Sequence, residues 1–164
     1  MAQDEVKSYY DFSHSFYDLY VFALLCNTEI MDLREFYSET GKLLYAVAES
    51  DGMITSRERV ELHNLIQSRL TQRETHTDEF GTNDAWYTEF EFEVAEEQGM
   101  TAEDAFNSFA EFIDENRNKL DKDLKDVCMI LADRLADSYH HTNKKEKHII
   151  QRLKETLYSL QPIH

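Results

Sequence analysis

Apolar residues recur along most of this chain at spacings of three and four, which is the period of a helix with one buried face. These stripes predict seven helices, namely residues 4–26, Asp32 to the Asp51-Gly52 loop, 56–69, Trp86 to Gly99, Ala105 to Ile113, Leu124 to Leu135 and Ile149 to Leu160. One proline and four glycines in 164 residues leave few of the turn signals that a sheet protein needs. The sequence therefore predicts an all-α fold, a compact bundle of about seven helices.

The length of the chain suits one hydrophobic core, so we expect a single domain over residues 1–164. A polar segment, residues 71–84, predicts the connection between an N-terminal half, 1–70, and a C-terminal half, 85–160. Early in the C-terminal half, Trp86, Phe90 and Val94 have the spacing of a buried helix face. Gly41 interrupts the second predicted helix, where glycine weakens helix formation modestly.

A helix-loop-helix segment occurs twice in the sequence, 88 residues apart. Residues 48–58, Ala-Glu-Ser-Asp-Gly-Met-Ile-Thr-Ser-Arg-Glu, return without a gap as residues 136–146, Ala-Asp-Ser-Tyr-His-His-Thr-Asn-Lys-Lys-Glu. The same offset pairs the apolar positions Leu43 with Leu131, Val47 with Leu135, Leu62 with Ile150 and Leu65 with Leu153. We therefore predict an internal duplication. The copies differ most in the loop, where Asp51-Gly52 is replaced by Tyr139-His140.

Acidic residues outnumber basic ones, with 33 Asp and Glu against 17 Lys and Arg and a net charge of -16. Such a surface repels a phosphate backbone, so we expect no nucleic-acid partner. It suits cations, basic proteins or simple solubility equally well. Charge therefore narrows the class of partner without selecting one.

The two cysteines, Cys26 and Cys128, lie within apolar helical stripes, which is typical of free buried thiols. The N-terminus has no basic leader, and the apolar stretch from Leu19 to Cys26 is too short to cross a bilayer. We therefore expect a cytoplasmic protein without membrane insertion.

The loop of the first copy carries the first candidate metal site. Gly52 and Glu58 keep the spacing of a calcium-binding loop, and Glu49 and Asp51 fill two of its acidic positions, although the first ligand position falls on Val47. We therefore predict a looser divalent-cation site formed by Glu49, Asp51 and Glu58.

The same loop has a purely structural interpretation. Thr55-x-x-Glu58 is a capping box, in which the threonine and the glutamate satisfy backbone amides at a helix start. Gly52 supplies the positive φ that follows a helix. For Glu58 we favour the cap over a metal, and the second copy keeps it as Asn143-x-x-Glu146.

A second, weaker candidate metal cluster consists of Asp137, His140, His141 and Glu146. Asp137 and His140 are three residues apart and can share a helix face, as a transition-metal site requires. Adjacent histidines in a polar loop are, however, more typical of solvated side chains. The chain has no glycine-rich phosphate loop, no His-Glu-x-x-His and no Gly-x-Ser-x-Gly, so we expect no catalytic activity.

Residues 43–58, Leu-Leu-Tyr-Ala-Val-Ala-Glu-Ser-Asp-Gly-Met-Ile-Thr-Ser-Arg-Glu, resemble the signature of the TerB-like tellurite-resistance family, which is also found in the N-terminal region of DjlA-type J-domain co-chaperones. The pattern is matched at Ala46, Asp51, Gly52, Ile54 and Glu58. With the second copy the resemblance covers residues 30–160. It implies an all-helical fold with internal pseudo-symmetry, a bacterial stress context and a metal-sensing or scaffolding role.

Our preferred hypothesis is a non-enzymatic TerB-like stress-response module, implicated in tellurite resistance, that binds a protein partner and a divalent cation at the Asp51-Gly52 loop. Stress-response or membrane-associated proteins are the expected partners. The alternatives are a metal-dependent hydrolase that activates water with clustered carboxylates, and a structural helical adaptor whose loops hold only caps. A homodimer contact is expected at the N-terminal aromatic residues Tyr9, Tyr10, Phe12, Phe16, Tyr17 and Tyr20.

Overall fold

The chain divides into two units, residues 1–30 and residues 31–164. Of the second unit, the computed structural model describes residues 31–138, except positions 73, 75, 76, 78 and 80, and residues 144–158. The helix predicted over residues 4–26, the expected dimer contact and Cys26 lie outside the described residues, as do His140 and His141. The single domain over 1–164 stays a prediction.

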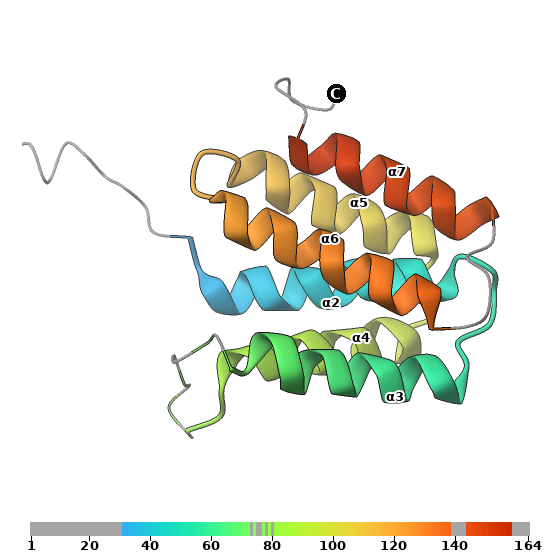
Figure 1. The fold of residues 1–164 in the computed structure, drawn as a ribbon, viewed down its shortest axis with the longest axis horizontal. Coiled ribbons are helices and arrows are strands. Elements are labelled where there is room, and N and C mark those ends of the chain that lie inside the picture. Colours follow the sequence, from blue (N-terminus) through green and yellow to red (C-terminus); the bar gives the residue numbers. More distant parts are fainter. Residues whose placement is uncertain are drawn as a thin grey trace, which may run out of the picture. The chain divides into compact units, whose positions relative to one another are not determined.

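The described residues form six α-helices and no strand (Figure 1). The helices are α2 (Leu33–Glu49), α3 (Ser56–Leu65), α4 (Tyr87–Glu97), α5 (Ala102–Glu115), α6 (Lys122–Asp137) and α7 (Lys144–Tyr158). A π-helical turn, η1 (Ile66–Leu70), extends α3, and a 3-10 turn, η2 (Asp84–Trp86), precedes α4. The all-α prediction is confirmed for these residues. The count of seven depends on residues 4–26 and stays a prediction.

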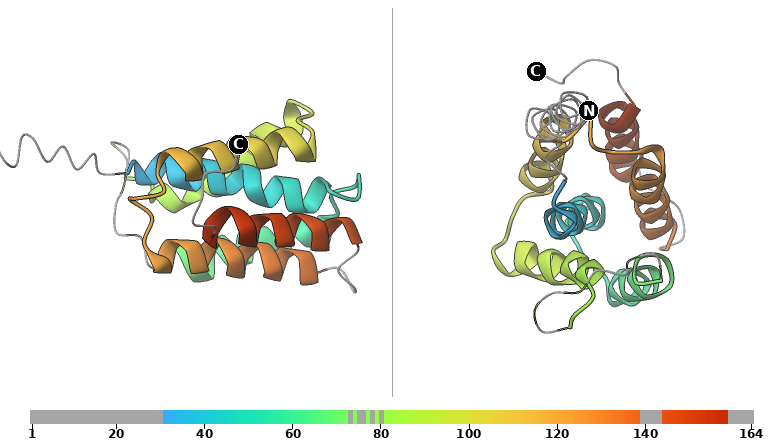
Figure 2. Two further views of the ribbon diagram at one scale, coloured as in Figure 1. Left: turned by 90° about the horizontal axis from the view of Figure 1, so that it is seen from above. Right: turned by 90° about the vertical axis from the view of Figure 1, so that its left-hand side faces the viewer.

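Helix α2 lies at the centre of this unit. It contacts α4, α5, α6 and α7, and α3 lies beside α6, so that in the end-on view of Figure 2 the other helices surround α2. Every residue from Leu43 to Ala48 is buried, which an amphipathic helix with one buried face does not require. This run of six therefore reflects a central helix that is packed on all sides.

Gly41 allows the backbones of α2 and α4 to approach each other closely. A Cβ atom at Gly41 would lie 2.4 Å from the carbonyl oxygen of Thr88 and 3.1 Å from Cβ of Glu91. The first contact is too short for a carbon atom, and the second is tight enough to require a small shift of the neighbour. The glycine that weakens the predicted helix is therefore the residue that lets α4 pack on it.

The buried face of α4 differs from the prediction. Phe90 is 58% exposed, so its expected core position is wrong, whereas Phe92 is 1% exposed. The buried residues of α4 are Thr88, Phe92 and Ala95, whose spacings of four and three are as helical as those of the predicted stripe. The close contact of this face with Gly41 decides which of the two stripes turns inward.

Several helix ends follow local rules that the sequence displays. The side chain of Asp32 accepts the amide of Arg34 at 2.9 Å at the start of α2. Thr101 Oγ1 accepts the amide of Asp104 at 3.1 Å at the start of α5. These caps satisfy amides that have no partner within the helix, and they place the loops between the helices.

Candidate functional site

The Asp51-Gly52 loop joins α2 to α3 and is held by its own backbone. Gly52 has φ +89°, and its amide donates to the carbonyl of Glu49 at 2.8 Å. The amide of Met53 donates to Asp51 Oδ1 at 3.1 Å. Asp51 therefore closes the turn with one carboxylate oxygen, as short polar side chains commonly do in turns.

Glu58 is the helix cap that the sequence predicts. Its Oε2 accepts the amide and the hydroxyl of Thr55, both at 2.7 Å, while Thr55 Oγ1 accepts the amide of Glu58 at 3.2 Å. Glu58 is 4% exposed. The capping box is thus confirmed, and the carboxylate is turned toward the start of α3 rather than toward solvent.

Among the described residues, no group of three or more His, Cys, Asp or Glu side chains is gathered so as to hold a metal ion. Glu49, Asp51 and Glu58 thus lie near one another in the chain without converging in space. In the second loop, Glu146 is 5% exposed and Asp137 is exposed at the end of α6, while their predicted partners His140 and His141 lie outside the described residues. Both metal sites stay predictions.

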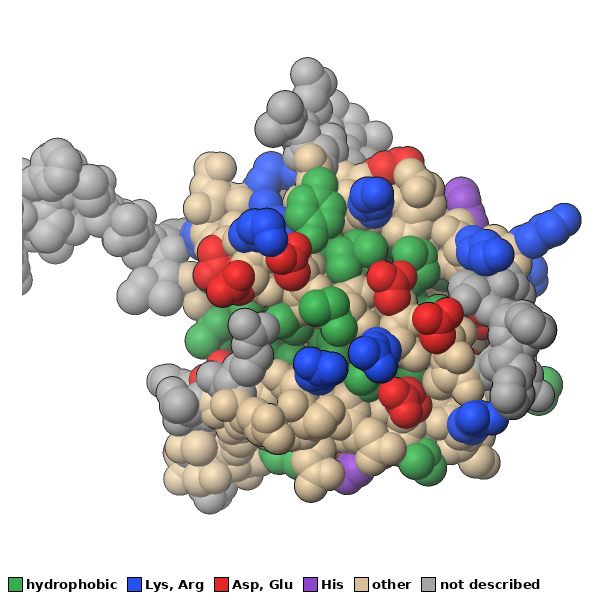
Figure 3. Space-filling model, viewed as in Figure 1, with side chains coloured by type: hydrophobic (Ala, Val, Ile, Leu, Met, Phe, Trp, Pro, Cys, Tyr) green, Lys and Arg blue, Asp and Glu red, His purple; other side chains and the backbone are tan. Residues whose placement is uncertain are grey.

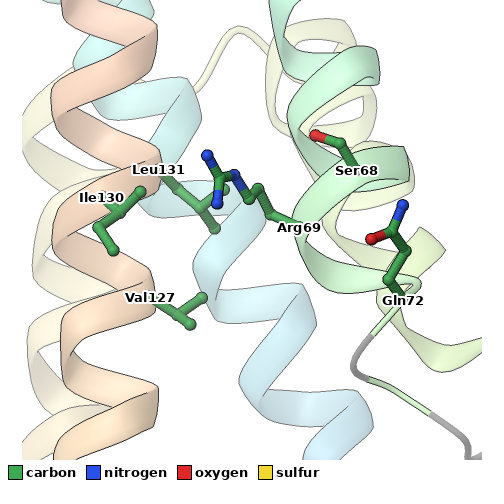
Figure 4. Close-up of a pocket in the computed structure, with 6 residues that line it drawn as sticks. All are labelled: Ser68, Arg69, Gln72, Val127, Ile130 and Leu131. Atoms are coloured by element: carbon green, nitrogen blue, oxygen red, sulfur yellow. The ribbon is translucent and has the colours of Figure 1, made fainter.

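A groove runs along α6, opposite η1 and the start of α2. It consists of two hollows, of about 360 and 290 Å³, that share Val127. The first hollow is lined by Ser68, Arg69, Gln72, Val127, Ile130 and Leu131 (Figure 4). The second is lined by Leu33, Phe36, Tyr37, Leu70, Glu74, Asp121, Asp123, Leu124 and Val127. We call both hollows together the α6 groove.

The α6 groove has an apolar floor and a charged rim. Ile130 is 44% exposed and forms the apolar side of the first hollow with Val127 and Leu131. Apolar side chains of this face lie among charged ones in Figure 3. Arg69 extends from η1 toward the apolar side chains of α6 (Figure 4) and has no ion-pair partner among the described residues. At the other hollow the rim is acidic, with Glu74, Asp121 and Asp123. The charge of the groove therefore changes from basic at one end to acidic at the other.

Sequence reasoning missed this groove. Val127 and Leu131 belong to the stripe that the sequence predicts as buried, whereas Ile130 does not. An isoleucine outside the apolar stripe of an amphipathic helix was the available signal. The exposed isoleucine forms a groove only together with η1, which the fold brings alongside α6.

A separate apolar hollow, of about 300 Å³, lies on α4 and η2 and is lined by Thr82, Trp86, Tyr87 and Phe90. The guanidinium carbon of Arg34 lies 4.8 Å from the centre of the Tyr87 ring, and the His63 ring centre lies 5.4 Å from that of Trp86. Trp86 and Tyr87 are thus engaged within the fold. Phe90 remains the exposed apolar side chain of this hollow.

The thiol of Cys128 is not a reactive site. It is free and fully buried, 4.0 Å from Thr40 Oγ1, and burial raises its pKa to about 12. Since the thiolate is the reactive form of cysteine, this side chain serves packing.

No family model, curated protein or solved structure gives a significant match to this chain. None of the described helices is both long and apolar enough to cross a membrane.

Proposed function

We propose that the chain is a TerB-like, non-enzymatic module that binds a protein partner during chemical stress such as tellurite exposure, with a divalent cation bound at the Asp51-Gly52 loop. The observation that carries the proposal is the duplicated helix pair. Helices α2 and α6 end at residues 49 and 137, the next helices begin at 56 and 144, and η1 and α7 end at 70 and 158. Each of the three differences is 88, the offset of the sequence repeat.

The ends of α2 and α6 support the same duplication in atomic detail. The amide of Ser50 donates to the carbonyl of Val47 at 3.3 Å, and the amide of Ser138 donates to that of Leu135 at 3.1 Å. These donors and acceptors are again 88 residues apart. Both serine hydroxyls are buried, and neither has a hydrogen-bond partner among the described residues. Such agreement is expected of two copies of one structural unit.

The contact between Thr40 and Cys128 supports a two-fold relation between the copies. These residues are also 88 apart, and their side chains meet at 4.0 Å. A residue that touches its own equivalent lies on the axis that relates the two copies. Helix α2 contacts α7, and α6 contacts α3. A two-fold rotation that exchanges the copies turns the first contact into the second, so both are expected. A TerB-like pseudo-symmetric fold accounts for these features together.

Loss of the gene in its source organism, followed by growth in tellurite, tests the stress role. Reduced tolerance that is restored by the wild-type gene is the expected result, and unchanged tolerance would refute it. Isothermal titration with calcium, magnesium, manganese and zinc tests the cation site. Asp51→Asn is expected to abolish binding, and cation binding that is unaffected by this variant excludes the loop.

The second candidate is the helical adaptor without a cation. It is favoured by a specific observation, because Asp51 and Glu58 already accept the amides of Met53 and Thr55. If the chain captures the same partner in EDTA as in millimolar calcium, the adaptor is the correct description. Capture that requires the cation favours the first proposal instead.

A further inference from the structure

We propose that the α6 groove binds an amphipathic helix of a partner protein, with acidic residues at the N-terminal end of that helix and basic residues at its C-terminal end. This inference rests on the proposed function, since it identifies the partner-binding surface and uses the duplicated helix pair. The inference goes beyond the proposed function because it specifies the groove, the secondary structure of the partner segment and the order of the charges on that segment.

In the other copy, the surface equivalent to the α6 groove is covered by a helix. Subtracting 88 from Val127 and Ile130 gives Glu39 and Lys42, on α2. Lys42 Nζ donates to Ser108 Oγ of α5 at 3.2 Å, and the same hydroxyl donates to Glu39 Oε2 at 2.9 Å. Helix α5 thus lies over the surface that corresponds to the α6 groove.

The opposite wall follows the same correspondence. Adding 88 to Ser68, on η1, gives Thr156, on α7. The carbonyl of Thr156 accepts Arg117 Nη1 at 3.4 Å, just beyond the end of α5. Both walls of the counterpart surface are therefore bridged by α5 or by the turn that follows it. A helix is the element that this pair of walls accommodates.

The covered surface on α2 and the α6 groove differ in polarity. The covered surface uses the polar residues Glu39 and Lys42, whereas the groove presents Val127 and Ile130 at the equivalent positions. Its floor continues through the apolar residues of the second hollow. An apolar floor with a polar rim is the arrangement that receives the apolar face of an amphipathic helix.

Charges of opposite sign lie at the two ends of the α6 groove. Within the described residues Arg69 is unpaired at one end, and Asp121 and Asp123 lie at the other. A small amphiphile of one charge would satisfy one end only. From Asp121 to Ile130 the groove follows α6 over nine residues, or about 14 Å at 1.5 Å per residue, which suits a helix of two to three turns.

The position of α5 also gives the direction of the bound helix. Phe112, near the C-terminal end of α5, packs on Phe36 near the start of α2, with ring centres 6.4 Å apart. The start of α2 corresponds to the start of α6, where Asp121 and Asp123 lie. The C-terminal end of a bound helix thus meets the acidic rim and its N-terminal end meets Arg69. Basic residues at the C-terminal end also match the helix dipole.

Fluorescence anisotropy with two labelled peptides tests the proposal on the full chain. The matched peptide carries the apolar stripe of α5, with glutamates in its first turn and lysines in its last. The reversed peptide has the same composition with these charges exchanged. We expect the matched peptide to bind at least tenfold more tightly. Equal affinities, or no binding of either peptide at millimolar protein, would overturn the proposal.

Three variants locate the binding site. Ile130→Glu is expected to weaken the matched peptide at least tenfold, because it places a charge on the groove floor. Val60→Glu is the matched control, since Val60 is a 61% exposed apolar residue of α3 outside the groove, and it should leave binding unchanged. Arg69→Glu should weaken the matched peptide, and a peptide with lysines in its first turn should restore binding. This rescue distinguishes contact from misfolding.

Other occupants are separate outcomes of the same assay. Preferential binding of a peptide with the sequence of residues 4–26 would overturn the partner proposal, as would concentration-dependent self-association that Ile130→Glu abolishes. The proposed function fails independently. If the Ile130→Glu variant no longer binds the peptide and still restores tellurite tolerance, peptide binding in the groove is not needed for the stress role. If loss of the gene leaves tolerance unchanged, only the stress role is refuted.

Discussion

Replacement of Gly41 by alanine tests the packing at the centre of the bundle. The added Cβ would lie 2.4 Å from the Thr88 carbonyl oxygen, whereas ordinary contact begins at 3.4 Å, so the backbone of α4 must retreat by about 1 Å. Overpacking of this kind costs about 1–3 kcal/mol. Alanine returns about 1 kcal/mol through its higher helix propensity. Because the obstructing atom belongs to a buried backbone, we take the upper cost and expect a net loss of about 2 kcal/mol.

Urea unfolding followed by circular dichroism at 222 nm measures this loss. A decrease of about 2 kcal/mol lowers the folding equilibrium constant about thirtyfold. Gly52→Ala is the control, because Gly52 has φ +89° with no atom within 4 Å of an added Cβ, so that only backbone strain of about 1–2 kcal/mol applies. Gly41→Ala that is as stable as the wild type would refute the close approach of α2 and α4.

Three further predictions concern single side chains. Thr55→Ala removes the cap of α3 and should lower the unfolding free energy by about 1 kcal/mol in the same urea assay; no change would contradict the capping box. Hydrogen bonding to Arg59 lowers the pKa of Glu96 below its ordinary value of 4.5. The pair therefore stabilises the fold above that pH and ceases to do so as the pH falls through the lowered pKa. The stability difference between wild type and Glu96→Gln should accordingly shrink below pH 4.5, and a difference independent of pH would contradict it. Cys128, with its pKa raised to about 12, should escape iodoacetamide at pH 8 in the native protein and react in guanidinium chloride, as peptide mapping would show; equal labelling in both states would contradict its burial.

The predictions that succeed are those in which the interacting groups are close in sequence. The side chain of Thr55 accepts an amide three residues ahead, so its predicted cap depends only on a short window of sequence, and the caps at Asp32 and Thr101 follow the same local rule. The apolar periods of the helices and the 88-residue offset are likewise properties of the sequence. These signals predict the all-α class and the position of the Asp51-Gly52 turn.

The prediction for α4 fails because two apolar stripes on that helix have equivalent spacing. Nothing within residues 87–97 distinguishes the stripe of Phe90 from that of Phe92. The choice depends on Gly41, which lies about fifty residues earlier in the chain. The candidate carboxylates show the same limit, since local spacing does not specify whether Asp51 and Glu58 converge or bind separate amides.

By itself the sequence determined which segments of the described unit form helices and how α3 is capped, because hydrophobic period and capping act within a few residues. Only the tertiary structure decided that α2 is the central helix, that α4 turns Phe90 outward and that Arg69 faces Ile130 across a groove. Each of these features depends on contacts between segments that are far apart in the chain. Two faces of a helix can have the same helical spacing, and the space left by a neighbouring backbone decides which of them is buried.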